Sequence, residues 1–400
     1  MKILIINTYY YPNMIGGTEN SIKILAENLA KLDNNIVAVY SADNNNKKLK
    51  KEKINNVEMY RGHAGRYQIE RLKNFNTKKI KKIRNKILEL NNITAKKEIR
   101  TVIEDFQPDV IHTNNLFGIS TIIWKIAKEK YNIPIIHTLR DYWMLYPIVS
   151  NEKLSKILLQ PFMRKRTKYV DVVTAPSNCT LEKFIDNGYF KSSKKECVVN
   201  AIDIDIEETR RIIDDKTKRK NKDIKFMFVG MLTENKGIRN LLEAFTSIKN
   251  DKISLHIYGQ GILESLVKDK EKQDNRIKYH GQLKNEDLKE EWIKNDVLIV
   301  PSIWEEPFGR VVIEGNQYGL PVIGANRGGI KEIIDLTHAG KTYQFDNIKE
   351  LKNKIEYFCD RDKIKKYFQN ILSNIEIYSI KTQLNTFMNI YTEEWKSYKE

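Results

Sequence analysis

The chain has 400 residues, of which 41% are hydrophobic and 30% charged, and its formal net charge is +17. This length exceeds what a single hydrophobic core usually covers, so we expect two domains. No recognisable RNA- or DNA-binding motif accompanies the basic excess, which argues against a nucleic-acid partner. The three cysteines are too scattered for a disulfide framework or a metal-ligand spacing.

Lysine and arginine concentrate in four stretches, residues 47–53, 78–86, 164–168 and 216–225. These stretches are either solvated connections and helix faces, or a positive surface for anionic membrane lipid or a phosphate-bearing substrate. The N-terminus lacks the apolar region of a signal peptide, and no run approaches the ~20 apolar residues of a membrane span. We expect a cytoplasmic protein, at most peripheral on the inner face of the cell membrane.

Short apolar runs alternate with helical patterns over the first 200 residues, which predicts βαβ units around a buried parallel sheet. The strands expected here are Lys2–Asn7, Ile36–Ser41, Val110–Thr113, Pro134–Leu139 and Val170–Ala175. Helical patterns cover Ser21–Leu32 and Ile119–Lys130, and a basic amphipathic stretch over residues 68–104 predicts a helix pair.

Gly16 and Gly17 follow the first strand and open a helix. Paired glycines at a helix N-terminus let backbone N–H groups approach an anion, although a tight strand-to-helix turn would need glycine there as well. The dinucleotide fingerprint GxGxxG is missing, because Glu264 stands where the third glycine would follow Gly259 and Gly261. This argues against a dinucleotide-dependent oxidoreductase.

The alternation restarts in the second half, which predicts a second doubly wound domain. The strands expected here are Lys225–Val229, Ser254–Tyr258, Ile277–His280, Val297–Pro301 and Pro321–Gly324. Residues 203–223 are polar and read as the linker between the halves. The last segment, about residues 378–398, predicts a helix with apolar side chains on one side. We expect a ligand site at the carboxyl ends of the strands, in a cleft between facing domains.

Residues 297–319 carry the densest cluster of candidate site residues. Pro307 and Gly309 break the chain after a strand, so a helix is expected to start near Phe308–Arg310 with free N–H groups for a diphosphate. Arg310 and Glu314 are i,i+4 neighbours, either a surface ion pair or a carboxylate for ribose hydroxyls.

Two further helix starts follow strand ends in this half. Lys236 and Gly237 lie beyond the strand that ends near Val229, where a lysine can neutralise a phosphate, and Gly328 and Gly329 open another helix. Together with the carboxylates, these predict a site for a nucleoside diphosphate with a group attached.

Several motifs resemble the retaining GT-B glycosyltransferases of family 4. They are GGTE with LAENLAKL, FVGML with NKG, and PSIWEEPFGRVVIEGNQYGLPVIGANRGG with the trailing Glu332. The resemblance spans both halves. It implies an α/β GT-B fold of two Rossmann-like doubly wound domains facing a central cleft, with the C-terminal helix returning to the first. The corresponding boundaries are residues 1–200 (acceptor side), 201–377 (donor side) and 378–400 (returning helix).

The resemblance also implies roles for individual residues. Glu314 would hold the ribose hydroxyls, and Glu306 would contact the hydroxyls of the donor sugar. Phe308, Gly309, Arg310 and Val311 would meet the sugar and diphosphate, Lys236 would bind the diphosphate, and Gly16 and Gly17 would close on it from the other domain. His137 would lie near the anomeric centre, although a lone histidine at a strand end is more often structural. No metal and no cofactor are implied.

The chain departs from the family pattern at Met231, and it contains an apparent metal-binding motif at Asp203 and Asp205. Met231 stands where the family usually has an arginine that pairs with the lysine on the diphosphate, and we hypothesise that Arg310 or Arg327 supplies the missing charge. Asp203 and Asp205 mimic a metal-binding DxD motif, but they match the family's passage into the second domain.

The sequence therefore predicts a retaining hexosyltransferase. It would move a sugar from a UDP- or GDP-sugar to a hydroxyl of a carbohydrate or lipid-linked acceptor in cell-envelope polysaccharide or glycolipid synthesis, without any nucleic acid. A GT-B nucleotide-sugar epimerase, a pyridoxal-phosphate phosphorylase and a non-catalytic partner subunit remain alternatives, and Met231 is the feature that favours the last of these.

Overall fold

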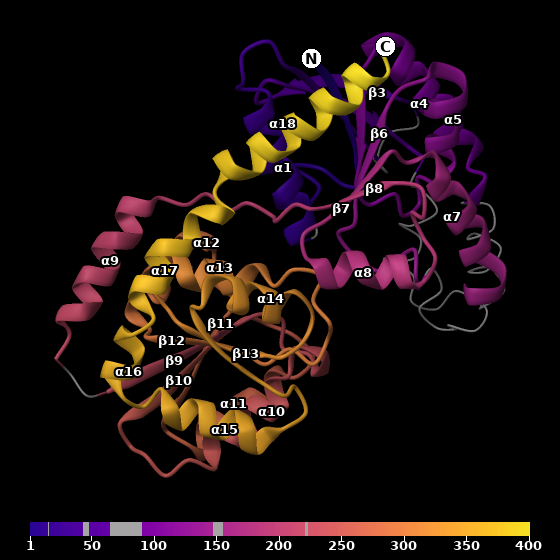
Figure 1. Cartoon of the computed structure of the whole chain (residues 1–400). Coiled ribbons are helices and arrows are strands. Elements are labelled where there is room, and N and C mark those ends of the chain that lie inside the picture. The colour runs from indigo at the N-terminus through magenta and orange to yellow at the C-terminus, as the bar shows by residue number, and fades with distance from the viewer. Residues whose placement is uncertain (15, 43–47, 65–89, 147–154, 221–222) are drawn as a thin grey trace. The chain divides into compact units, whose positions relative to one another are not determined.

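The computed structural model describes the chain except residue 15 and residues 43–47, 65–89, 147–154 and 221–222. Its contacts divide the chain into two compact units (Figure 1). Unit 1 comprises Met1–Ala201 and Ile380–Glu400, and unit 2 comprises Ile202–Ser379. The basic stretch at residues 78–86 and the first part of the helix pair expected over residues 68–104 lie outside the described residues.

Unit 1 is built on an eight-stranded sheet in the order β3-β4-β2-β1-β5-β6-β7-β8, parallel except for the β3–β4 pair. The strands are β1 Lys2–Ile6, β2 Ile36–Ala42, β3 Lys50–Ile54, β4 Val57–Gly62, β5 Val110–Thr113, β6 Ile135–Thr138, β7 Val172–Ala175 and β8 Lys194–Cys197. The five predicted strands are all present, with ends shifted by at most two residues.

Alternate side chains of β1 enter different cores. Ile3 and Ile5 pack in one cluster with residues of α1 and α18, whereas Leu4 and Ile6 pack in another with residues of α4, α5 and α8. This period of two is the one a strand buried on both faces requires. The helices and helical turns of the unit are α1 Gly17–Leu29, α4 Ile93–Phe106, α5 Ile122–Tyr131, η1 Ser155–Leu159, α7 Gln160–Arg166, η2 Thr167–Tyr169, α8 Asn178–Asp186 and α18 Ile380–Ser397.

The C-terminal helix α18 completes unit 1, where it lies against α1 (Figure 1). Phe387 and Tyr391 are fully buried in the core beneath it. Polar contacts fix its register: the Tyr391 hydroxyl lies 2.6 Å from His112 Nδ1, and Trp395 Nε1 donates to Asp109 Oδ1 at 3.0 Å. The last residues of the chain are thus part of the first globular unit.

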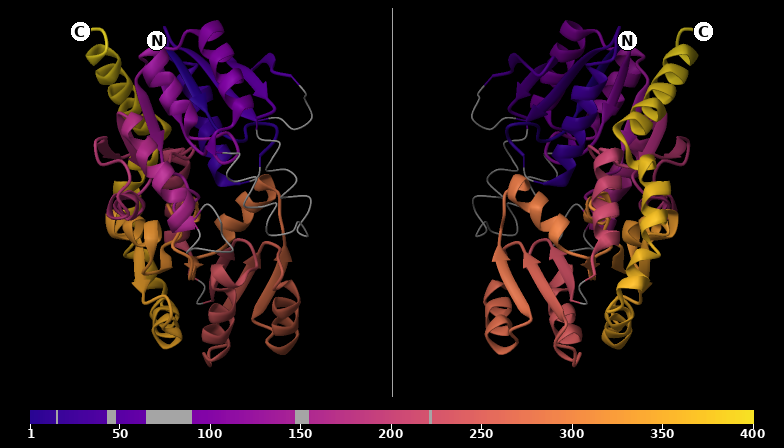
Figure 2. Two further views of the ribbon diagram at one scale, coloured as in Figure 1. Left: turned by 90° about the vertical axis from the view of Figure 1, so that its right-hand side faces the viewer. Right: turned by 90° about the vertical axis from the view of Figure 1, so that its left-hand side faces the viewer.

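Unit 2 has a six-stranded parallel sheet in the order β11-β10-β9-β12-β13-β14. Figure 2 shows strands and helices of this unit from two further sides. The strands are β9 Ile224–Val229, β10 Ile253–Tyr258, β11 Ile277–Gly281, β12 Val297–Val300, β13 Val322–Ala325 and β14 Gly340–Tyr343. Its helices and helical turns are α9 Ile206–Lys218, η3 Glu234–Lys236, α10 Ile238–Thr246, α11 Glu264–Gln273, α12 Asn285–Lys294, α13 Arg310–Gln317, α14 Gly328–Thr337, α15 Ile348–Tyr357, α16 Arg361–Lys365, α17 Phe368–Asn374 and η4 Ile375–Tyr378. No helix in the described ranges is long and apolar enough to cross a membrane.

The interpretation of residues 203–223 as a linker was wrong. Most of this segment is helix α9, and Thr209, Ile212, Ile213 and Lys216 are buried on one side of it. The many charges of the segment lie on the remaining faces, so the average composition concealed an amphipathic helix. Asp205, the second carboxylate of the apparent DxD motif, is the N-cap of this helix and accepts the Glu208 N–H at 2.9 Å.

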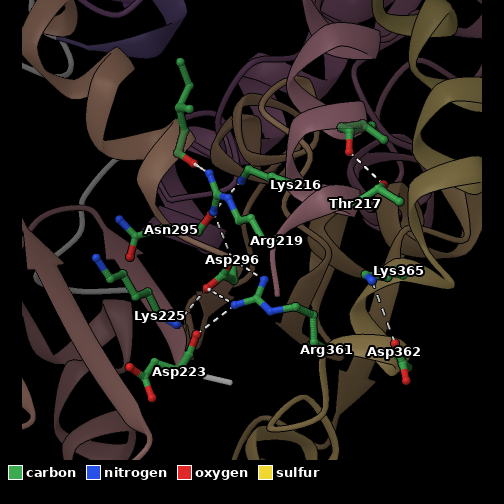
Figure 3. A network of polar contacts seen from close by, with 12 residues as sticks. Lys216, Thr217, Arg219, Asp223, Lys225, Asn295, Asp296, Arg361, Asp362 and Lys365 are labelled. Carbon is green, nitrogen blue, oxygen red and sulfur yellow. Dashed lines mark hydrogen bonds and ion pairs between the residues drawn. The ribbon is translucent and has the colours of Figure 1, made fainter. Parts of the chain in front are cut away.

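A buried polar network fixes α9 and α16 to the amino-terminal edge of this sheet (Figure 3). Asp296, directly before β12, accepts hydrogen bonds from Arg219 Nη1 at 3.1 Å, Arg361 Nη1 at 3.0 Å and the Lys225 N–H at 3.0 Å. The Lys216 side chain, which is 1% exposed, donates to the Asn295 carbonyl at 2.6 Å, just beyond the C-terminus of α12. Burial lowers the pKa of this amine well below its ordinary value, and the nearby charges of Arg219 and Arg361 also lower it.

Candidate active site

The candidate residues of unit 2 gather where the sheet's connectivity changes direction. Strands β9 and β12 are neighbours, but the chain continues from β9 toward β10 and from β12 toward β13. The crevice at such a point, at the carboxyl ends of the strands, is where doubly wound sheets bind ligands. The loops that leave β9 and β12 carry Lys236 and Glu306.

Lys236 and Glu306 form an ion pair, with 2.5 Å between Nζ and Oε1. The same carboxylate oxygen accepts a hydrogen bond from Ser302 Oγ at 3.0 Å. The two side chains are 27% and 17% exposed, so the pair is partly shielded from water yet reachable. The sequence placed both residues at the site, but it did not predict that they pair with each other.

The backbone holds these two loops together. The Asn235 carbonyl accepts the N–H groups of both Ile303 and Trp304 at 3.0 Å, so the turn η3 and the loop after β12 are joined. Gly237 has a φ of 72°, and a Cβ there would lie 1.8 Å from the Pro301 carbonyl oxygen. Only glycine combines this conformation with so close an approach.

Helix α13 begins at Arg310, directly after Gly309, as the sequence predicted. Gly309 has a φ of 95°, which favours glycine. Among the N–H groups of the first turn, those of Arg310 and Val311 have no acceptor within the helix and are available to an anion. The Phe308 ring is 6% exposed and packs 6.1 Å from the Tyr378 ring, so only its backbone can meet a ligand.

Arg310 and Glu314 form the second acid–base pair of the site, with 2.7 Å between Nε and Oε1. Their side chains are 22% and 34% exposed. Nη1 of Arg310 is buried and has no hydrogen-bond partner among the described residues. A buried donor without an acceptor is costly, so a ligand atom that reached this nitrogen would remove that cost.

Gly328 and Gly329 open helix α14, as the sequence predicted, and they also contact the backbone of Glu306. The Gly329 N–H donates to the Glu306 carbonyl at 2.8 Å, and a Cβ on Gly328 would lie 2.4 Å from that oxygen. The two glycines thus let the start of α14 pack against the backbone of Glu306. This helix start supports the loop, and at least one of its N–H groups is not available to a phosphate.

Met231 and the two arginines that could replace the missing charge, Arg310 and Arg327, lie in different surroundings. Met231 is 59% exposed just beyond β9. The Arg327 guanidinium lies over the Phe345 ring, 4.2 Å from its centroid, whereas Arg310 is within the cluster around the start of α13. Of the two, Arg310 has the buried donor that lacks a partner.

In unit 1, Gly16 and Gly17 lie at the equivalent change of direction, at the carboxyl ends of β1 and β5. They line a cavity of about 280 Å³ together with Thr8, Tyr9, Thr18, Glu19, Asn115, Phe117 and Asp141. The Gly16 N–H donates to Glu19 Oε2 at 2.8 Å, so one N–H of this helix start is already bound within the chain.

Asp141 is the most unusual side chain of this cavity. It accepts the Trp143 N–H at 3.0 Å and a hydrogen bond from Asn115 Nδ2. Burial raises its pKa to about 6, and the nearby Glu19 charge contributes to the rise. Sequence reasoning missed this residue, although an Arg-Asp pair directly after strand β6 was a usable signal, because polar residues at strand ends line such clefts.

His137 does not lie at this cavity. It is within β6, 1% exposed, with Nδ1 at 2.9 Å from Thr113 Oγ1 and its ring stacked on Phe190 at 5.7 Å. Burial lowers the pKa of this imidazole to about 3, so it is neutral at physiological pH. The structure thus places His137 in the hydrophobic core beneath the site and brings Asp141 to the surface of the cavity.

In the described part of the chain, no group of three or more His, Cys, Asp or Glu side chains is arranged to hold a metal ion.

Comparison with known proteins covers nearly the whole chain. The family model of Glycosyltransferase Family 4 matches residues 15–206, and that of Glycosyl transferases group 1 matches residues 209–371. An uncharacterized 42.6 kDa protein in the cps region of Klebsiella pneumoniae is 32% identical, over 83% of this chain and 87% of the relative.

Among solved structures, sucrose-phosphate synthase from Thermosynechococcus elongatus is similar with a TM-score of 0.73 at 17% identity, covering 99% of both chains. Anabaena Alr3699/HepE in complex with UDP is similar with a TM-score of 0.70 at 18% identity, covering 98% of this chain and 100% of the other. The chain therefore belongs to the glycosyl transferases of group 1, glycosyltransferase family 4, and has their GT-B fold of two Rossmann-like domains.

Proposed function

We propose that the protein transfers a hexosyl group from a nucleoside diphosphate sugar to a hydroxyl acceptor with retention of anomeric configuration. The observation that carries the proposal is the Lys236–Glu306 ion pair beside the start of α13, at the point where the connectivity of the sheet reverses. A cation and free helix N–H groups suit a diphosphate, and the carboxylates suit the hydroxyl groups on either side of it.

In this proposal the basic and acidic members of the two pairs bind different parts of the donor. Lys236 and the N–H groups of Arg310 and Val311 bind the diphosphate, while Glu306 contacts the sugar hydroxyls and Glu314 the ribose hydroxyls. Gly16 and Gly17 of unit 1 contribute backbone contacts to the donor. Because each carboxylate has a cation within 2.7 Å, the diphosphate would not meet uncompensated negative charge.

The chemical step consists of one bond broken and one bond formed at the anomeric carbon. The bond from this carbon to the diphosphate breaks, the acceptor oxygen bonds on the same face, and the acceptor proton passes to the departing diphosphate. Lys236 and the start of α13 would stabilise the charge that develops on the leaving group, which is where preorganised donors accelerate a reaction most.

The acceptor would bind in the cavity of unit 1. Asp141, Glu19 and Asn115 are hydrogen-bonding groups for sugar hydroxyls, and Phe117 offers an aromatic surface for the apolar face of a sugar ring. The relative from a cps region supports a role in cell-envelope polysaccharide or glycolipid synthesis. The complex of the Anabaena protein with UDP supports a uridine donor over a guanosine donor.

Donor binding is tested by the thermal midpoint of unfolding in the presence of UDP, GDP, ADP and their sugars. A ligand that binds only the folded state raises the midpoint. We expect a shift with one nucleotide, lost in Lys236→Ala and Glu314→Ala and retained in Lys268→Ala, which removes an exposed ion pair with Glu264 on α11. A wild-type protein that responds to none of these nucleotides would contradict the proposal.

A further inference from the structure

A groove of about 440 Å³ runs between α4 and α5 of unit 1, two neighbouring helices (Figure 1). Ile122 and Ile126 of α5, both buried, form its apolar floor. Its walls are lined by four cationic side chains, Lys96 and Arg100 from α4 and Lys125 and Lys130 from α5, and by one carboxylate, Glu129 of α5. None of these residues belongs to the candidate active site.

Positive charge in this groove is only partly compensated. Lys125 lies 3.6 Å from Glu129, and Lys130 lies 3.1 Å from Glu104. Among the described residues, no carboxylate oxygen lies within 4.0 Å of the charged nitrogens of Lys96 or Arg100, although the Arg100 charge acts on Glu104 and helps to lower the pKa of that carboxyl. Burial, together with the charges of Arg166, Arg100 and Lys125, lowers the pKa of Lys96. The like charges repel one another, and an anion bound among them would relieve that repulsion.

Two large apolar side chains are exposed on α4 and α7, the helices that carry Lys96, Arg100 and Arg166. Ile93 is 66% exposed and precedes Lys96 by three residues and Arg100 by seven, so all three share one face of α4. Phe162 of α7 is 58% exposed, one helical turn before Arg166.

Arg166 connects α7 to the groove. Its Nη1 donates to the Leu90 carbonyl, just before α4, and lies 3.2 Å from Thr121 Oγ1, just before α5. We call Ile93, Lys96, Arg100, Lys125 and Phe162 the basic face of unit 1. It combines cations whose charge is incompletely neutralised with exposed apolar side chains.

We propose that the basic face docks the protein on an anionic lipid bilayer. Its cations lie at the lipid phosphates, and Ile93 and Phe162 enter the boundary between headgroups and acyl chains. Surfaces that bind membranes reversibly combine these two kinds of side chain, and each basic residue near an anionic surface strengthens binding. The docking is a property of unit 1 and does not depend on the transfer reaction proposed above.

The test is co-sedimentation of the full-length protein with lipid vesicles. We expect binding to phosphatidylcholine vesicles that contain phosphatidylglycerol, weakened by salt, and little binding to phosphatidylcholine alone. Lys96→Glu with Arg100→Glu should weaken binding at least about twentyfold, since one cation contributes about fivefold. Phe162→Ser should weaken binding severalfold without changing its salt dependence.

The matched control is Lys218→Glu with Lys272→Glu, the same charge change at exposed lysines of unit 2, which should bind as the wild type does. The thermal midpoint of each variant verifies that it is folded. Absence of wild-type binding to anionic vesicles at low salt would overturn the proposal. Equal weakening of binding in both double variants would also overturn it, because the effect would then come from net charge. Displacement of the protein from the vesicles by inorganic phosphate at matched ionic strength would overturn it as well, because the groove would then bind a soluble phosphate ligand.

Discussion

Glu306 and Glu314 stand on either side of the break at Pro307–Gly309, and each is bound to a cation from a different part of the site. Lys236 reaches Glu306 from the loop after β9, and Arg310 reaches Glu314 from one turn earlier in the same helix. The seven residues between the carboxylates contain the start of α13, which separates the two pairs. A nucleotide sugar bound along this segment would have its diphosphate between its two sets of hydroxyl groups.

Asp141 gives a prediction for a single residue. Its pKa is raised to about 6 from an ordinary value near 3.8, so the folded protein holds this proton more tightly than the unfolded chain does. The contribution of Asp141 to stability therefore falls as pH rises from about 4 to 6. Relative to the wild type, Asp141→Asn should be more stable by about 1–3 kcal/mol at pH 7 and equally stable below pH 4.

Urea unfolding of both proteins at several pH values measures this difference. Asp335→Asn, at a carboxylate that is 52% exposed, is the control and should show a small difference that does not vary over the same range. A difference between wild type and Asp141→Asn that does not change with pH would contradict the prediction. A carboxylate kept at a cost to stability is expected where function requires it.

Whether a residue could be predicted from the sequence depended on how local its signal was. The start of α13 followed from Pro307 and Gly309, because backbone chemistry acts within a few residues. His137 and Asp141 are four residues apart at the end of one strand, and only the extent of β6 decides which of them leaves the core. The pairing of Lys236 with Glu306 depends on strands that are distant in sequence becoming neighbours.

At the level of elements, the interior strands were predicted except β4, whereas of the described edge strands β3, β8, β11 and β14 one, β11, was predicted. The strands β1 and β12 are continuous apolar runs, whereas β3 and β8 lie at the edges of their sheet and have sequences rich in lysine. Lysine on an edge strand discourages pairing with another molecule. The same lysines remove the apolar pattern from which a strand is predicted.

The network at Asp296 gives a prediction for the elements that it joins. Asp296→Ala would leave Arg219 and Arg361 without their buried carboxylate and should destabilise unit 2 by about 3 kcal/mol. Asp362→Ala, which removes a carboxylate that is 88% exposed and 3.9 Å from Lys365, should cost less than about 0.5 kcal/mol. Both residues are seen in Figure 3. Chemical denaturation measures the two values, and similar costs would show that the network adds no stability.

Helix α18 gives the second prediction at this level. Phe387 is fully buried between this helix and the sheet of unit 1. Phe387→Ala should destabilise unit 1 by about 3–5 kcal/mol, through lost burial and the cavity left behind. Amide hydrogen exchange should show faster exchange in β1 and β5 and unchanged exchange in β9 and β12. Faster exchange confined to α18 itself would mean that this helix does not stabilise the sheet of unit 1.

For the whole molecule, four histidines with lowered pKa values predict sensitivity to acid. Burial lowers the pKa of His137 to about 3 and that of His256 to about 4, and it also lowers the pKa of His112 and His280. Below pH 6.5 these histidines bind protons in the unfolded chain but not in the folded protein. Their contribution to the free energy of unfolding is therefore fully present above this pH and is lost progressively toward pH 3.

The two buried imidazoles, His112 and His137, should each contribute a slope of about 1.4 kcal/mol per pH unit in this range, and the more exposed His256 and His280 should contribute less. Equilibrium unfolding at pH 7, 6 and 5 measures the total. The slope should decrease in His256→Gln, whose imidazole lies in unit 2 against His280. A stability that stays constant between pH 7 and 5 would contradict the assignment of these histidines as neutral in the folded protein.

The central claim is that the two acid–base pairs of unit 2 bind a nucleotide sugar for transfer. The most direct measurement is the NMR spectrum of the product formed with a nucleotide sugar and a carbohydrate acceptor, recorded for wild type, Lys236→Ala and Glu306→Gln. We predict an acceptor-dependent glycoside with the anomeric configuration of the donor, formed at least about a hundredfold more slowly by both variants. An inverted product, a product formed without acceptor, or variants as active as the wild type would contradict this account.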